Sequence, residues 1–111
     1  MELWHDQAMF AIQVSQLIAY IWKQNYFCTF GEACRSQEQA ELYAKEGKGI
    51  CHSLHCDRLA IDLLLHDKQG NYLTDPKIYE PFGIYWETLD PKNRNGRHFP
   101  RPDSNHFERM R

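Results

Sequence analysis

The stretch Leu59-Ala-Ile-Asp-Leu-Leu-Leu65 decides the fold of this chain. An almost unbroken apolar run of this length predicts a strand that is buried on both faces, as strands in the middle of a sheet are. Asp62 interrupts the run, and burying an unpaired carboxylate is costly. We therefore expect a partner beside Asp62, either an arginine, a capping contact or a metal ion.

The segments on either side of this strand predict further elements. Apolar residues three or four positions apart indicate a helix from Glu2 to Lys23. Asp75-Pro76 is typical of a helix start, so a second helix is expected to run to Leu89. We also expect a strand at 25–30, a helix at 36–46, a hairpin through the turn at 67–70 into 71–74, an irregular loop at 90–103 and a strand at 105–109.

This order of elements predicts the fold class. It favours an α+β fold in which a small antiparallel sheet packs with three helices and the functional site lies at the sheet. A chain of 111 residues is of the size of one domain, so we expect a single domain over 1–111.

The charge and the hydropathy of the sequence argue against some classes of binding partner. A formal net charge of −2 gives no general attraction to nucleic acid or to an anionic membrane. No apolar run approaches the ~20 residues of a membrane span, and Met1 to Asp6 lacks the features of a signal peptide. We expect a monomer that is synthesised in the cytoplasm without a signal peptide.

A metal ion is the more specific explanation for a carboxylate at position 62, because a histidine, His55, lies seven residues earlier, at the start of the same strand. Zinc commonly takes a third protein ligand and leaves one position for water. His5 and His66 are weaker candidates for that ligand, whereas His52, His98 and His106 remain open. His106 stands out because Asp103 and Glu108 flank it, and a carboxylate beside a ligand can act as a base or orient the imidazole.

Several segments, in this order, resemble the M15 family of zinc metallopeptidases. Ser53-Leu54-His55 with Ala60-Ile61-Asp62 is similar to the family's Ser-x-His-x-x-x-x-Ala-x-Asp segment, and Asp103 to Glu108 is similar to its closing Asp-x-x-His-Phe-Glu segment. Arg35-Ser36 and the loop from Gly96 to Phe99 also resemble family segments. The family contains D-Ala-D-Ala carboxypeptidases, D-Ala-D-Ala dipeptidases and phage L-alanyl-D-glutamate endolysins.

The resemblance implies one zinc ion held by His55, Asp62 and His106, with Asp103 as the general base. It implies that Arg35 reaches the substrate carbonyl. Glu108 is the alternative base, or the residue that orients His106. The implied function is hydrolysis of peptidoglycan stem peptides by a phage or bacterial lytic enzyme that acts on the cell wall after release.

Other residues are assigned from their types. Ser53 and Trp86 are candidate substrate contacts, although Ser53 also suits a turn and Trp86 also suits a helix core. Arg94, Arg97 and Arg101 can either meet anionic stem peptides or form a solvated loop face. The family often has glycine at the position of Arg58, so the turn between the first two ligands is expected to differ.

Three alternatives stay open. Cys51, His52, His55 and Cys56 can form a small structural zinc module, although four ligands within six residues crowd one tetrahedron. One of the cysteines, paired with His55 or His106, can serve as a hydrolase nucleophile. The third alternative is a non-catalytic cell-wall-binding domain that retains the peptidase fold.

Overall fold

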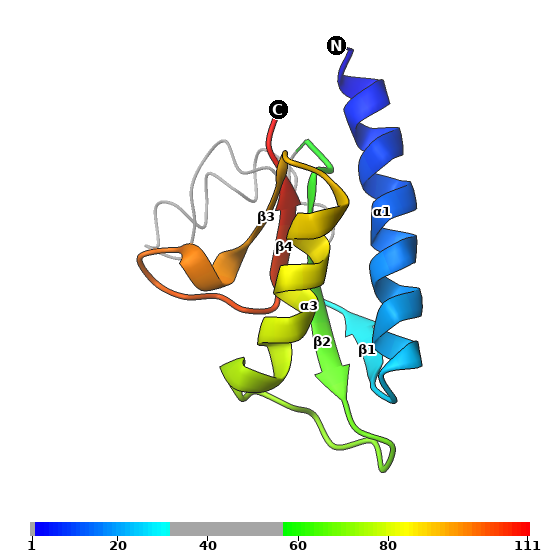
Figure 1. The fold of residues 1–111 in the computed structure, drawn as a ribbon, viewed down its shortest axis with the longest axis vertical. Coiled ribbons are helices and arrows are strands. Elements are labelled where there is room, and N and C mark those ends of the chain that lie inside the picture. The colour runs from blue at the N-terminus through cyan, green and yellow to red at the C-terminus, as the bar shows by residue number, and fades with distance from the viewer. Residues whose placement is uncertain (1, 32–56) are drawn as a thin grey trace.

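The computed structural model describes residues 2–31 and 57–111. In chain order the elements are α1 (Leu3–Lys23), β1 (Phe27–Phe30), β2 (Ala60–His66), α3 (Pro76–Leu89), β3 (Asn93–Asn95), the 3-10 turn η1 (Gly96–His98) and β4 (His106–Arg109) (Figure 1). The predicted α+β fold is confirmed. Neither α-helix of the described ranges is long and apolar enough to cross a membrane.

The described strands form one four-stranded sheet in the order β1-β2-β4-β3. Every neighbouring pair in this sheet is antiparallel, as expected for a small α+β domain. The predicted strand around Asp62 therefore takes a central position, between β1 and β4. Because β4 comes from the end of the chain, the sheet brings the C-terminal segment directly beside β2.

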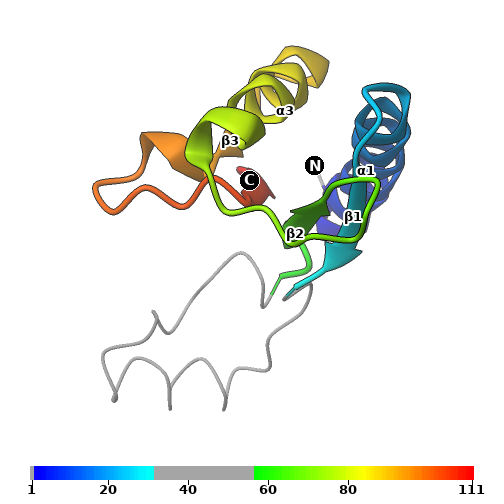
Figure 2. The same cartoon turned by 90° about the horizontal axis from the view of Figure 1, so that it is seen from below.

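The two described α-helices, α1 and α3, cover the same side of this sheet (Figure 2). The apolar stripe predicted for α1 is present, with Leu17 and Ile21 fully buried. They pack with Phe82 and Trp86 of α3 and with the inward side chains of β2 and β4. Buried contacts of this kind are the main favourable contribution to folding.

The two faces of β2 differ more than the sequence predicts. Ile61, Leu63 and Leu65 are buried, whereas Asp62, Leu64 and His66 are intermediate in exposure. Side chains alternate between the two faces of a strand, so the intermediate set forms the face opposite the helices. The expectation that both faces are buried is wrong for this part of β2. Asp62 is half-buried, with 24% of its side chain exposed.

The segment 90–103 is more regular than the loop predicted for it. It contains β3 and η1, and β3 pairs with β4. The sequence of β3 is Asn-Arg-Asn, which has no apolar alternation, and polar contacts fix it instead. The Asn93 side chain donates to the carbonyl of Trp86 and to Gln13, and Asn95 N donates to Glu87.

Three other predictions have different outcomes. The start of α3 is confirmed, because Asp75 caps it by accepting a hydrogen bond from Lys77 N at 3.0 Å. The hairpin after β2 is reduced to a single antiparallel bridge between His66 and Tyr72, closed by a turn whose amides donate to Asp67. The helix predicted at 36–46 lies outside the described residues.

Candidate metal centre

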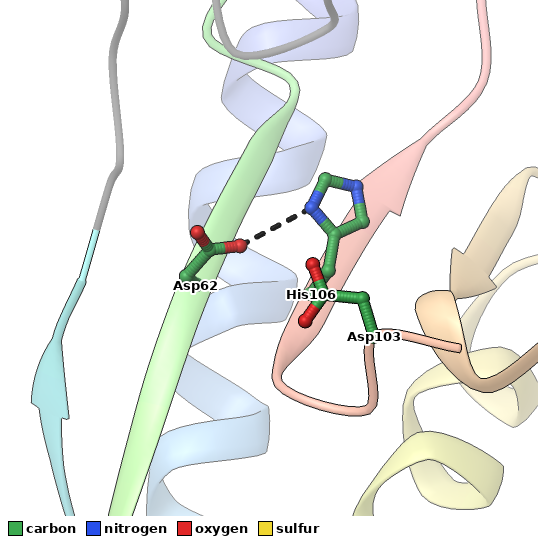
Figure 3. A group of neighbouring side chains, drawn as sticks. All are labelled: Asp62, Asp103 and His106. Atoms are coloured by element: carbon green, nitrogen blue, oxygen red, sulfur yellow. Dashed lines mark hydrogen bonds and ion pairs between the residues drawn. The ribbon is translucent and has the colours of Figure 1, made fainter. Parts of the chain in front are cut away.

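Asp62 of β2 and His106 of β4 lie directly opposite each other in the sheet. Leu63 N donates to Asn105 O, and Arg109 N donates to Leu59 O. With this alternation, Asp62 and His106 form a pair without mutual backbone hydrogen bonds, the type whose side chains approach most closely. Asp62 Oδ1 lies 3.2 Å from His106 Nδ1, and the two side chains point toward each other (Figure 3).

The third side chain of the site comes from the loop that leads into β4. The carboxylate of Asp103 lies beside the Asp62–His106 pair (Figure 3). One ligand atom of each of these three residues lies within 4.8 Å of those of the other two. Two hydrogen bonds hold the loop in place: His106 N donates to Asp103 O at 3.1 Å, and Asp103 N donates to Gly96 O at 2.9 Å.

Asn95 also fixes this loop, a role that the sequence analysis did not assign. Its side chain is fully buried and donates to the carbonyl oxygens of Ser104 and His106, at 3.0 and 2.9 Å. An asparagine followed by a glycine suggests only a turn in the sequence. Its function depends on contacts with residues that come about ten positions later, which no local pattern reveals.

The electrostatics of the site place a buried imidazole among carboxylates. Burial disfavours the imidazolium, but hydrogen bonds and attraction from Asp62 and Glu108 outweigh it and raise the pKa of His106 to about 9. Burial and the negative charge of Asp62 raise the pKa of Asp103 above its ordinary value, although His106 opposes this. A higher pKa makes a carboxylate a better proton acceptor.

The distances suit a small divalent cation. A tetrahedral zinc ion with bonds of about 2.0–2.2 Å keeps neighbouring ligand atoms about 3.3 Å apart. The separation of 3.2 Å between Asp62 Oδ1 and His106 Nδ1 matches this value. One imidazole nitrogen and two carboxylates are also ligand types that zinc accepts. The residues present therefore fit a metal site.

Glu108 lies on the far side of the imidazole from Asp62. Its Oε1 is 2.7 Å from His106 Nε2, and Trp86 Nε1 donates to its backbone oxygen. A carboxylate that accepts a hydrogen bond from the second nitrogen of a ligating histidine fixes the orientation and tautomer of the ring. Of the two roles considered for Glu108, this position suits orienting His106.

Trp86 was considered both as a substrate contact and as a core residue, and its position supports the core role. Its side chain is 0% exposed, at the centre of the core between Phe10 and Phe107. The aromatic residues of α3 suited either a groove or a core, and at position 86 the helix faces the sheet. Trp86 supports the site only indirectly, through its hydrogen bond to Glu108.

Two of the three arginines of the late segment also bind within the protein. Arg97 pairs with Glu87 at 2.6 Å, and Arg94 pairs with Glu108 at 2.6 Å. Of the other histidines considered as ligands, His66 Nε2 lies 2.9 Å from Thr29 Oγ1, and His98 lies beside Glu87.

Several predicted site residues lie outside the described residues. They are the ligand His55, the substrate contacts Arg35 and Ser53, and the remaining members of the cysteine module, Cys51, His52 and Cys56. The described part of the site therefore comprises two of the three predicted ligands and the predicted base.

No family model matches the sequence, and neither does any curated protein. Among the solved structures with a similar fold is the L-Ala D-Glu endopeptidase ChiX of Serratia marcescens. The TM-score is 0.65 at 16% sequence identity, and the match covers 76% of this chain and 67% of that chain. At this identity the likeness concerns the fold. The group formed by Asp62, Asp103 and His106 thus lies in a chain that shares its fold with an L-Ala D-Glu endopeptidase.

Proposed function

We propose that this chain is a zinc-dependent peptidase that hydrolyses the stem peptides of peptidoglycan, with the L-alanyl-D-glutamate bond as its preferred target. The observation that carries the proposal is the convergence of Asp62, Asp103 and His106 on one face of the sheet. The fold shared with an L-Ala D-Glu endopeptidase supports the choice of substrate. The M15 resemblance of the same residues points to the same chemistry.

In this proposal Asp62 and His106 hold one zinc ion together with His55. Zinc, when bound, polarises a water molecule and the scissile carbonyl, so that attack becomes feasible near neutral pH. The 3.2 Å separation of Asp62 Oδ1 and His106 Nδ1 requires little rearrangement on metal binding.

Asp103 is the proposed general base. It takes a proton from the attacking water and later gives it to the amine of the leaving peptide. Asp103 is also more exposed than Asp62, so its carboxylate can reach a substrate that approaches from solvent.

A cleft of about 200 Å³ adjoins Asp103 and suits part of a peptide. It is lined by Tyr72, Thr74 and Tyr79 on one side and by the loop 102–105 on the other. We assign this cleft to the stem peptide on one side of the scissile bond. Arg35 and Ser53 are proposed to contact the substrate on the sheet face, with Arg35 stabilising charge on the carbonyl oxygen.

The organisation of the enzyme is part of the same proposal. Residues 1–111 form a single M15-like catalytic domain that acts as a monomer. The protein is made in the cytoplasm and reaches the cell wall after release, as a phage or bacterial lytic enzyme does.

Digestion of purified peptidoglycan tests the proposal. Mass spectrometry of the soluble fragments is expected to show new D-glutamate N-termini, and a zinc chelator should abolish them. Asp103→Asn should abolish the fragments while the variant still binds zinc. Glu80→Gln removes an exposed carboxylate of α3 and should leave activity unchanged. Fragment release that persists in the chelator or in Asp103→Asn would contradict the proposal.

A further inference from the structure

Glu108 divides its two carboxylate oxygens between two partners. Oε1 is 2.7 Å from His106 Nε2, and Oε2 accepts from Arg94 Nε at 2.9 Å and from Arg94 Nη2 at 2.6 Å. The Glu108 side chain is 5% exposed, whereas that of Arg94 is 47% exposed. The carboxylate is thus held between a buried imidazole and a guanidinium at the surface.

The sheet itself sets this arrangement. Arg94 of β3 is the register partner of Glu108 in β4, so their side chains lie on the same face of the sheet. His106 lies two residues before Glu108 on β4, and it therefore shares that face as well. Three neighbouring positions of two paired strands place the guanidinium, the carboxylate and the imidazole in a row.

Phe99 links Arg94 to His106 by a second route. The guanidinium carbon of Arg94 lies 5.0 Å from the centroid of the Phe99 ring. The Phe99 and His106 rings are 5.3 Å apart, with an angle of 53° between them. Arg94 therefore contacts two side chains that lie beside the imidazole, Glu108 and Phe99.

We propose that Arg94 is a positioning residue that acts through Glu108 to hold His106 with Nε2 as a hydrogen-bond donor and Nδ1 turned toward Asp62, where the metal would bind. The inference rests on the proposed metal site. An ionised carboxylate only accepts hydrogen bonds, so Glu108 keeps the ring proton on Nε2. The two bonds from Arg94 to Oε2 prevent the carboxylate from turning away from the imidazole. Glu108, engaged at both oxygens, orients the ligand and does not take a proton from water.

Zinc affinity is the direct readout, because activity alone cannot separate positioning from chemistry. Competition with a chromophoric chelator should show that Arg94→Gln binds zinc about tenfold more weakly than the wild type, or weaker still. Arg94→Lys keeps the charge but loses the two-pronged contact, so its affinity should fall between those of the wild type and Arg94→Gln. Arg101→Gln, which alters an exposed arginine of the same segment, should bind as the wild type does.

A double-variant cycle tests whether Arg94 acts through Glu108. Glu108→Gln should weaken zinc binding, and adding Arg94→Gln to that variant should cause little further loss. If the losses of zinc affinity in the two single variants multiply in the double variant, Arg94 does not act through Glu108. Wild-type zinc affinity in both Arg94 variants would also overturn the proposal. Unfolding temperatures of the metal-free variants show whether a loss of affinity merely reflects misfolding. Arg94→Lys keeps the positive charge, so it provides a second variant in case Arg94→Gln does not fold. If the wild type itself binds no zinc, the proposed function fails, and this inference with it.

Discussion

Gly96 lies so close to the carbonyl oxygen of Asp103 that a β-carbon at position 96 would overlap it. The same Cβ would approach His106 Cβ at 3.1 Å. The 3-10 turn thus contacts the backbone of the candidate base directly, and its carbonyl accepts the hydrogen bond of Asp103 N. Only a residue without a side chain allows the loop to bring Asp103 next to Asp62.

This contact predicts that Gly96→Ala impairs catalysis. The added methyl group must push the 103–106 loop away, which moves Asp103 from the metal centre and costs about 1–3 kcal/mol of stability. Urea unfolding and fragment release from peptidoglycan measure the two effects. Gly70→Ala is the matched control, because Gly70 has a φ of 85° in a turn with no neighbouring atom for the Cβ to meet. It should lower stability and leave the activity of the folded enzyme unchanged. Equal activity in Gly96→Ala would contradict the role of this turn.

The burial of Trp86 predicts a variant that affects stability without affecting substrate binding. Trp86→Phe removes the hydrogen bond from Nε1 to Glu108 O, at 3.0 Å, and leaves that buried oxygen with one partner fewer. The expected loss is about 1–3 kcal/mol in the free energy of unfolding. The KM for a soluble stem peptide should stay within a factor of about two, because the ring does not reach the surface. A large rise in KM at unchanged stability would restore Trp86 as a substrate contact.

Acid should weaken the contact between the two ends of the chain. Arg109 is buried and binds Asp6 at 3.0 Å and Asp90 at 2.7 Å. Burial raises the pKa of each carboxyl group, but hydrogen bonds outweigh this effect. Both carboxylates accept from Arg109, Asp6 also accepts from Lys92, and Asp90 also accepts from Lys92 N and from Gln13. The pKa of each group therefore lies below its ordinary value of 3.8. Groups with a lowered pKa in the folded state stabilise it above the unfolded pKa and lose this effect as pH falls through the folded pKa.

The free energy of unfolding, measured in urea, should therefore decrease as pH falls below 3.8. Asp6→Asn should be less stable than the wild type at pH 7, and its stability should depend less on pH in the acid range. A wild-type stability that is flat in acid would show that these pairs add nothing measurable.

The sequence predicted the elements whose patterns are local. The apolar run around Asp62, the stripe of α1 and the Asp75-Pro76 start of α3 all correspond to observed elements. β3 was missed because its Asn-Arg-Asn sequence lacks any strand pattern and becomes a strand only by pairing with β4. Arg94 was treated as a loop arginine for the same reason, since its partner Glu108 is defined by that pairing.

For the site as well, the sequence indicated which residues take part but not how they are arranged. The cost of a carboxylate in an apolar strand and the M15 resemblance singled out Asp62, Asp103 and His106, but neither gives the register that places Asp62 opposite His106. Arg58 replaces a glycine that is frequent in the M15 family, and this substitution changes the turn less than the sequence alone suggests. Its φ of 58° lies in the left-handed region that favours glycine, the residue that the family often has there.

The anomalous X-ray signal of zinc in crystals grown with zinc chloride tests the central claim most directly. The anomalous map should show one strong peak above the zinc absorption edge and none below it. We expect this peak about 2.0–2.2 Å from Asp62 Oδ1 and from His106 Nδ1. The peak should disappear in crystals of His106→Ala. A peak at Cys51 and Cys56, or none beside Asp62 and His106 at saturating zinc, would contradict the proposed metal centre.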